Sequence, residues 1–262
     1  MGSEISVKSV TVITVCYNSS DTIQQTIDSV MNQTYGNIEY IIIDGGSTDG
    51  TIDKIKNYGS VITKFISEPD DGIYNAFNKG LKNASGDLIA FLNSDDIFAS
   101  NKVLASVVEE INVKEVDSLW SDIVFIDKNT EEVKRYYTCK KLNRSTFLKG
   151  LMPPHPGVYI KKSVYEKYGV FNENYEIASD YDLFLRFFYL KKVSFKYYPK
   201  ITVKMNEGGI SNENIFSTIK LNIEIYRTHK DHRVDISLFS ILAKIPTRLL
   251  ELIKKPKPKD YN

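Results

Sequence analysis

The chain has 262 residues, of which 42% are hydrophobic and 26% are charged. This composition is typical of a globular protein and excludes a disordered, collagen-like or coiled-coil chain. The formal net charge is +1, from 34 Lys and Arg against 33 Asp and Glu, so no overall field attracts nucleic acid. The two cysteines lack the spacing of a metal site or a disulfide framework, which favours a reducing compartment such as the cytoplasm.

The first part of the chain, through residue 112, has the pattern of βαβ units around a parallel sheet. Short β-branched runs alternate there with segments of helical periodicity. We expect strands over residues 10–15, 38–44, 61–67 and 88–92. We expect helices over residues 21–31, 51–58, 73–84 and 102–112.

The pattern changes after residue 115 to an α+β mixture. Strands are expected over residues 118–126, 132–137, 157–160, 193–198 and 201–205. Helices are expected near residues 162–168 and 181–190. No linker of biased composition separates the parts, so residues 8–112 and 113–210 are predicted to be halves of one domain with a shared core. Residues 211–262 are predicted to form a C-terminal extension.

Polar side chains follow each of the first four predicted strands. In an open parallel sheet, ligands bind beyond the carboxyl ends of the strands. Any one such segment is most simply a turn, because Asp, Asn, Ser and Gly are ordinary turn residues. Together they bring acidic groups to one edge, where carboxylates repel each other unless a cation or a donor-rich ligand lies among them. The segments are residues 16–19, 44–50, 68–72 and 93–96.

A divalent cation held by one or two carboxylates and by substrate phosphates fits this pattern, which suggests a nucleotide diphosphate. The turn over residues 17–21 contains no glycine, so a glycine-rich phosphate loop is excluded and the metal is expected to balance the phosphate charge. Asp44 and Asp71 are placed to accept hydrogen bonds from the ribose or the base. Tyr17 offers a flat face for stacking, with core packing as the alternative.

Four segments resemble, in order, the motifs of family-two inverting glycosyltransferases. They are VTVITVCYN (10–18), DGGSTDGT (44–51), EPDDGIYNAFNKG (68–80) and FLNSDD (91–96). The resemblance is strong over residues 10–98 and continues more loosely to about residue 205. Within the family, the sequence is similar to the bacterial branch that builds O-antigen and capsule. It implies an α/β GT-A fold, a nucleotide-sugar donor and a Mn²⁺ or Mg²⁺ cofactor. A UDP-sugar is the first expectation for the donor, with GDP- and dTDP-sugars as alternatives.

The resemblance also implies site residues. The family's aspartate-any-aspartate motif reads Asn93-Ser94-Asp95 here, so its first acid is missing. Asp95 falls on the metal-binding position, and Asp96 is expected to be a weaker second ligand or a helix cap. The donor nucleotide contacts that the resemblance implies are Tyr17, Asn18, Asp44, Gly45, Asp71 and Ser94.

An inverting displacement requires a general base near the acceptor hydroxyl. The segment Ser-Asp-Tyr-Asp-Leu over residues 179–183 resembles the family's acidic motif, and Asp180 falls on the position of the base. Acids are also favoured in a first helical turn by the helix dipole, which is the structural alternative. Asp182 is expected to be a structural partner of Arg186, four residues on.

Three further residues are candidates for contacts with the diphosphate or the acceptor. His155 lies in a proline-stiffened loop and could contact the diphosphate, the metal or the acceptor, or serve only the structure of the loop. The family usually has Gln after this histidine, and Pro156 departs from that pattern. Asp122 and Arg186 are the other two candidates.

The C-terminal end is basic, with nine Lys and Arg against four Asp and Glu over residues 227–262. Its apolar face over residues 236–253 predicts either a helix on an anionic membrane surface or a helix packed on the core. We expect no transmembrane helix and no signal peptide, and we expect no nucleic-acid partner.

The resulting hypothesis is a glycosyltransferase on the cytoplasmic face of the inner membrane that acts on a lipid-linked saccharide in O-antigen or capsule synthesis. A sugar nucleotidyltransferase and a non-catalytic glycan-binding or partner-binding module on the same fold are the alternatives.

Overall fold

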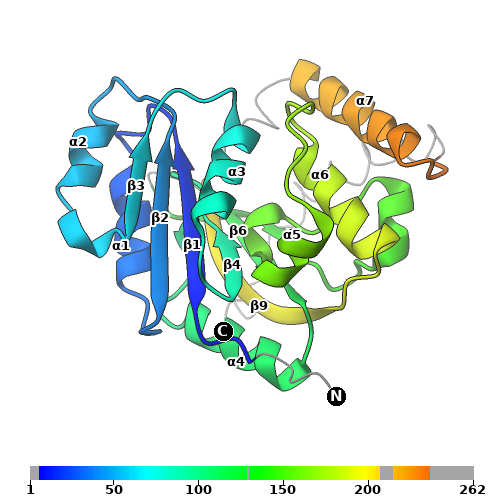
Figure 1. Ribbon diagram of the computed structural model, residues 1–262, viewed down its shortest axis with the longest axis horizontal. Helices are drawn as coiled ribbons and strands as arrows, with labels where there is room; N and C mark the ends of the chain where they lie inside the picture. Colours follow the sequence, from blue (N-terminus) through cyan, green and yellow to red (C-terminus); the bar gives the residue numbers. More distant parts are fainter. Residues whose placement is uncertain (1–5, 129, 207–214, 237–262) are drawn as a thin grey trace.

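The computed structural model describes residues 6–128, 130–206 and 215–236. Within these residues nine strands form one mixed sheet, in the order β3-β2-β1-β4-β8-β6-β9-β5, with β7 paired to β6. Helices cover both faces of this sheet (Figure 1). The arrangement is that of a layered α/β protein, in which each sheet face is covered by the apolar sides of helices.

The N-terminal part of the sheet is parallel, as the alternating pattern predicts. Its strands are β1 (Val10–Cys16), β2 (Ile38–Asp44), β3 (Lys64–Ser67) and β4 (Leu88–Phe91). They are connected by α1 (Ile23–Met31), α2 (Thr51–Lys56), the 3-10 turn η1 (Gly59–Val61) and α3 (Ile73–Asn83). β1 pairs in parallel with both β2 and β4, and β2 pairs in parallel with β3. The carboxyl ends of all four strands therefore meet at one edge.

The second part of the chain extends the same sheet with mixed strands. These are β5 (Ile97–Phe98), β6 (Ser118–Ile126), β7 (Val133–Tyr137), β8 (Val158–Lys161) and β9 (Phe195–Asn206). The helices and turns are α4 (Val103–Lys114), η2 (Arg144–Lys149), η3 (His155–Gly157), α5 (Lys162–Tyr168), α6 (Ser179–Phe184), η4 (Leu185–Leu190) and α7 (Ile215–Asp231). β8 joins the two parts by pairing antiparallel with both β4 and β6.

The core has one apolar layer on each face of the sheet. Successive side chains of a strand point to opposite faces, so the buried strand β1 contributes to both layers. Ile13 packs in the layer that contains Phe77 of α3. Val12 packs in the layer that contains Ile27 of α1 and Val107 of α4. This two-sided burial explains why the strand is apolar at almost every position.

The predicted helix over residues 181–190 differs from the observed structure. α6 begins earlier, at Ser179, and its continuation Leu185–Leu190 is π-helical. Almost every position of the segment LRFFYL is apolar, so its hydrophobic pattern cannot distinguish one helical hydrogen-bond register from another.

Two predicted strands, over residues 193–198 and 201–205, are one strand, β9. Its pairing with β6 shifts register between Ser121 and Asp122, whose β9 partners are Tyr198 and Ile201. Pro199 lies inside this shift, where a residue without an N–H group is tolerated. The two-residue strand β5 was not predicted, because it exists only through its pairing with β9.

The C-terminal extension is described only between residues 215 and 236. Here the chain forms α7, which lies beside α6 (Figure 1). Most of the predicted amphipathic segment over residues 236–253 lies outside the described residues. No helix within the described ranges is long and apolar enough to cross a membrane.

Candidate active site

The polar segments after β1, β2 and β4 are joined by hydrogen bonds that involve their side chains. The Asn18 backbone N–H donates to Ser47 Oγ at 2.8 Å, which links the first two segments. Ser19 Oγ and Ser94 Oγ lie 2.8 Å apart, which links the first and the fourth. Asn18 adopts a left-handed backbone (φ 48°), and its side-chain oxygen accepts from the Thr48 N–H at 2.9 Å. The strand ends therefore form one connected polar edge, which is called the donor edge below because the predicted donor contacts lie on it.

Asp44, at the end of β2, is a structural carboxylate. It is fully buried, and it accepts hydrogen bonds from the N–H groups of Gly46 and Ser47 and from the hydroxyls of Ser47 and Ser67. Burial by itself raises the pKa of Asp44, but these hydrogen bonds outweigh it and hold the pKa below its ordinary value. The predicted direct contact between Asp44 and the nucleotide stays a prediction, and in this structure the carboxylate is enclosed and accepts its hydrogen bonds from the protein.

Tyr17 and Gly45 lie beside Asp70, the neighbour of the predicted Asp71. Tyr17 is 65% exposed, so the core-packing alternative is wrong and its ring is open to a ligand. A Cβ atom added to Gly45 would lie 2.6 Å from Asp70 Oδ2 and 3.4 Å from the Tyr17 ring. Asp71 is exposed, whereas Asp70 is half-buried and accepts from the Gly72 N–H at 3.0 Å. Asp70 is thus the acid that faces Tyr17, and the sequence interpretation missed it because two adjacent acids in a turn are equivalent in pattern.

Asp95 and Asp96, after β4, have different environments. Asp96 is buried, its carboxylate accepts from Asn93 Nδ2 at 3.0 Å, and its backbone oxygen accepts from Thr26 Oγ1 at 2.8 Å. Burial, with the charge of Asp95, raises the pKa of Asp96 well above its ordinary value. The helix-cap alternative for Asp96 is wrong, because the next helix, α4, begins only at Val103.

Asp95 fits a metal ion whose other ligands are oxygens of the substrate phosphates. Its side chain is half-buried, and burial raises its pKa, so a cation would stabilise the charged form. Within the described ranges, no three His, Cys, Asp or Glu side chains group closely enough to hold a metal by themselves. A hard divalent ion needs only one or two carboxylates when a diphosphate provides the other oxygens.

Asp180 lies in the first turn of α6, on the other side of α3 from the donor edge. Its carboxylate is half-buried, accepts from the Tyr181 N–H at 2.7 Å and lies 3.5 Å from the Tyr74 hydroxyl. Burial raises the pKa of Asp180 to about 7, against hydrogen bonds that lower it. Tyr74 is in the first turn of α3, directly after the segment that contains Asp70. One tyrosine therefore connects the donor edge to Asp180.

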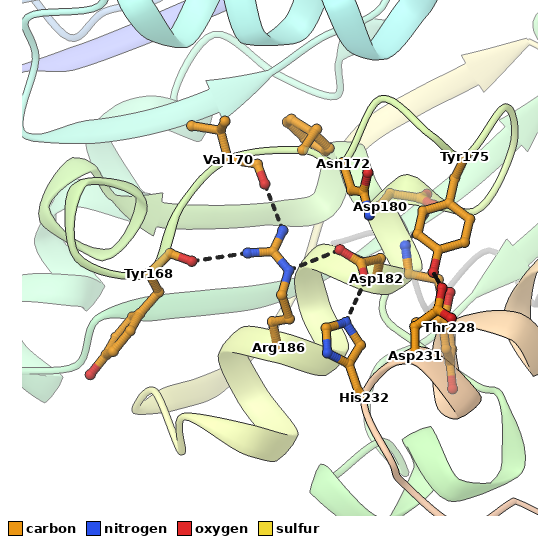
Figure 2. A network of polar contacts seen from close by, with 12 residues as sticks. Tyr168, Val170, Asn172, Tyr175, Asp180, Asp182, Arg186, Thr228, Asp231 and His232 are labelled. Carbon is orange, nitrogen blue, oxygen red and sulfur yellow. Dashed lines mark hydrogen bonds and ion pairs between the residues drawn. The ribbon is translucent and has the colours of Figure 1, made fainter.

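Asp182 and Arg186 form a structural network, shown in Figure 2. Arg186 Nε donates to Asp182 Oδ2 at 2.8 Å, which confirms Asp182 as its structural partner. The other guanidinium nitrogens donate to the carbonyl oxygens of Tyr168 and Val170 at 2.9 and 2.6 Å. His232, in the turn directly after α7, contacts Asp182 Oδ1 at 2.7 Å. The predicted contact of Arg186 with the diphosphate or acceptor stays a prediction, and in this structure each guanidinium nitrogen donates a hydrogen bond within the protein.

His155 lies in an aromatic cluster and is uncharged. Its ring centroid is 4.8 to 5.8 Å from those of Phe91, Phe77, Phe171 and Phe184. Burial lowers the pKa of His155 to about 3, so it carries no positive charge for a diphosphate at neutral pH. Its Nε2 atom is buried and has no hydrogen-bond partner among the described residues. This environment favours the structural alternative for the histidine.

Asp122 is a second enclosed carboxylate. It is buried in β6 and accepts from the Cys139 N–H at 2.8 Å, from the Tyr197 hydroxyl at 2.8 Å and from the Tyr136 hydroxyl. The predicted acceptor contact of Asp122 stays a prediction, and the three donors favour a structural role for this carboxylate inside the sheet.

A comparison with family models identifies the family. The model described as glycosyl transferase family 2 matches residues 11–169. The chain belongs to glycosyl transferase family 2. An uncharacterised glycosyltransferase of Mycobacterium tuberculosis (strain H37Rv) is 35% identical over 188 residues, which is 69% of each chain. The PGL/p-HBAD biosynthesis glycosyltransferase of Mycobacterium bovis (strain BCG) is 28% identical over 191 residues, 71% of this chain and 72% of that one. Family membership is as predicted and removes the nucleotidyltransferase alternative.

Solved structures confirm the predicted GT-A fold. S. aureus TarS 1–349 superposes with a TM-score of 0.66 at 19% identity, over 89% of this chain and 70% of that one. The chain spans 43% of the longer S. aureus TarS. The mannosyltransferase PcManGT from Pyrobaculum calidifontis, in complex with GDP-Man and Mn²⁺, has a TM-score of 0.64 at 18% identity, over 89% of this chain and 68% of that one.

The structural role of Asp44 predicts a stability difference between two aspartates of the donor edge. Asp44→Asn places an amide NH₂ against the donors of Ser47 and Ser67, so we expect the free energy of unfolding to fall by about 1–3 kcal/mol. Asp71→Asn, at an exposed position, is the matched control and should change it by less than about 0.5 kcal/mol. Urea unfolding measures both, and equal midpoints for Asp44→Asn and wild type would contradict the structural role.

Proposed function

We propose that this protein is an inverting glycosyltransferase that moves a sugar from a nucleotide diphosphate donor to a hydroxyl of a lipid-linked saccharide. The observation that carries the proposal is Asp180, a half-buried carboxylate whose pKa is raised to about 7 and which Tyr74 connects to the donor edge. A general base works best when its pKa is near the operating pH. An ordinary surface aspartate has a much lower pKa and is a weaker base.

The donor is proposed to be a nucleotide-sugar, with a UDP-sugar as the first candidate. S. aureus TarS 1–349, which shares the fold, has been solved with UDP-GlcNAc and with UDP. PcManGT has been solved with GDP-Man, so a GDP-sugar is the second candidate. The groups available to the nucleotide in this chain are the exposed ring of Tyr17, the half-buried Asp70 beside Gly45, and the two segments that contain Asn18 and Ser94. Gly45 leaves room at this point, because a side chain there would approach Asp70.

Asp95 is proposed to hold Mn²⁺ or Mg²⁺ together with the donor phosphates. PcManGT was solved with Mn²⁺, and the single half-buried carboxylate of Asp95 suits an ion that the diphosphate completes. When bound, such an ion supplies positive charge to the departing diphosphate.

Asp180 is proposed to take the proton of the acceptor hydroxyl. The hydroxyl oxygen then forms a bond to the anomeric carbon of the donor sugar, and the bond from that carbon to the diphosphate oxygen breaks with its electrons going to the diphosphate. Attack from the face opposite the leaving group inverts the anomeric centre. Asp180 reacts in its charged form, so the rate should fall as pH drops below its pKa.

The acceptor is proposed to be lipid-linked, and the enzyme to bind the cytoplasmic face of the inner membrane. Along α7 the side chains of Phe216, Ile219 and Ile223 are 82%, 51% and 61% exposed and share one helix face. Arg227 and Lys230 continue this face and are exposed. An apolar stripe that continues into basic residues suits an anionic bilayer surface, and the basic excess over residues 227–262 adds to that attraction. We propose a role in the synthesis of O-antigen or capsule. One relative is instead named for PGL/p-HBAD biosynthesis.

The first prediction concerns Asp180. Asp180→Asn should lower turnover by about 10²- to 10⁴-fold and leave UDP affinity within about twofold, because only proton transfer is lost. In the wild type kcat/KM should fall below a pH of about 7. The assay is UDP release from the sugar nucleotide that gives the largest thermal shift with Mn²⁺ in a panel that includes UDP-GlcNAc and GDP-Man.

A thermal melt separates loss of chemistry from unfolding. Burial disfavours the charged form of Asp180 and raises its folded-state pKa, so its cost to stability grows as pH rises through about 7. Asp180→Asn should therefore melt no lower than the wild type at pH 8. Near-normal turnover of this variant would show that Asp180 is not the base.

The second prediction concerns Asp95. Asp95→Ala removes the carboxylate proposed to hold the metal, so UDP affinity in Mn²⁺ should weaken by at least about tenfold, while affinity in EDTA stays the same. Glu109→Ala, an exposed acid on α4, is the control for loss of a negative charge. Calorimetric titration measures both conditions, and an unchanged affinity in Mn²⁺ would count against the assignment.

The third prediction concerns the face of α7. Replacing Phe216, Ile219 and Ile223 by Ser should weaken binding to phosphatidylglycerol-containing vesicles by at least about tenfold, since each buried apolar side chain contributes about 1.5–3 kcal/mol. Val113→Ser, an equally exposed apolar position on α4, should leave binding unchanged. Vesicle sedimentation measures this, and equal binding by the triple variant and wild type would exclude the α7 face as the contact.

A further inference from the structure

The helix that carries Asp180 begins without a capping side chain of its own. The N-cap residue of α6 is Ala178, which has no side-chain oxygen to accept from the first N–H groups of the helix. The segment that leads into α6 nevertheless needs partners for its backbone N–H groups, because Ala178 and Ser179 are buried. A residue from another element supplies these partners.

That residue is Glu224 of α7. Its Oε1 accepts from the Glu176 N–H at 3.1 Å, and its Oε2 accepts from the N–H groups of Ile177 and Ala178 at 2.9 Å each. The carboxylate is buried and lies 46 residues after Ala178 in the chain. Three charge-assisted hydrogen bonds therefore fix the backbone immediately before the turn that holds Asp180.

α7 also holds the residues that follow Asp180. His229 Nε2 and the Tyr181 hydroxyl lie 2.8 Å apart, and His232 Nε2 contacts Asp182 Oδ1 at 2.7 Å. In Figure 2 His232, which directly follows α7, points toward Asp182 at the start of α6. The segment around Asp180 is thus attached to α7 and the turn that follows it, through backbone N–H groups before the carboxylate and through side chains after it.

The charged and titratable groups around Asp180 come from three elements. α3 contributes the Tyr74 hydroxyl, and α7 contributes the Glu224 carboxylate. On its own helix, Asp182 is paired with Arg186. Glu224 is the group whose negative charge raises the pKa of Asp180 further, after burial.

We propose that Glu224 is a positioning residue for Asp180: it clamps the backbone before α6 and keeps a second negative charge beside the carboxylate that accepts the proton. The inference rests on the proposed role of Asp180 as the base. The clamp fixes where the carboxylate lies, and the charge favours transfer of a proton onto it. Glu224 has no contact with substrate in this role and acts only through α6.

Two substitutions separate the clamp from the charge. Glu224→Gln keeps the side-chain volume and one oxygen that can still accept from the Ile177 and Ala178 N–H groups. It removes the charge and the acceptor of the N–H group of Glu176, which is an exposed residue. The acid limb of the kcat/KM profile should then move to lower pH by about half a unit to one unit, because a like charge no longer disfavours the ionised form of Asp180. Glu224→Ala removes the clamp, so kcat should fall by at least about tenfold while UDP affinity in Mn²⁺ stays within about twofold.

The assay is release of UDP from the donor chosen by the thermal-shift panel, followed from pH 5 to 9, with UDP affinity measured by calorimetry. Glu166→Gln, an exposed glutamate of α5, is the control for a Glu-to-Gln change and should reproduce the wild-type profile. If a thermal melt shows that Glu224→Ala is unfolded, the acid limb of the kcat/KM profile of Glu224→Gln tests the positioning role of Glu224.

Asp180→Asn is measured in the same assay to distinguish the role of Asp180 as the base from the positioning role of Glu224. If Asp180→Asn is inactive but both Glu224 variants keep the wild-type kcat and acid limb, the positioning role is overturned and the base remains. If Asp180→Asn retains turnover, the base is overturned and the positioning role falls with it. An inactive Asp180→Asn together with a shifted acid limb in Glu224→Gln supports both.

Discussion

The parallel pairing of β1 with β2 and β4 is the constraint on which the site depends. Because the three strands run in one direction, the polar segments that follow them leave the sheet at the same edge. Hydrogen bonds from Asn18 to Ser47 and between Ser19 and Ser94 then join these segments into one surface. The apolar layers on both faces of β1 hold this register, since a shift of one residue would turn its side chains to the opposite faces.

Five of the aspartates in this chain differ in how their oxygens are used. Asp44, Asp122 and Asp182 are buried and accept hydrogen bonds or an ion pair from the protein itself, so they stabilise loops and helices. Asp95 and Asp180 are half-buried and have raised pKa values, caused first by burial. A carboxylate that the protein does not fully satisfy is available for a cation or a proton, which makes these two the candidates for chemistry.

α7 ties the acceptor side of the molecule to the C-terminal extension. Its inner face contacts the backbone before α6 through Glu224 and α6 itself through His229, and His232 in the turn after α7 adds a contact with Asp182. Its outer face carries the exposed apolar stripe that begins at Phe216. One helix therefore lies between the proposed membrane surface and the turn that holds Asp180, so docking and placement of the base involve the same element.

Much of the architecture is encoded locally, by features that neighbouring residues share. The β-branched runs and their spacing predict β2 and β6 at their observed bounds, because strand burial has a short period that is readable in sequence. The family motifs likewise indicate the edge where the polar segments meet. Tertiary structure alone decided that Asp70 rather than Asp71 lies beside Gly45 and Tyr17, that Asp122 is enclosed by two tyrosines, and that Glu224 holds the backbone before α6. These outcomes depend on which donors distant segments bring to a carboxylate, and hydrophobic periodicity carries no information about such pairs.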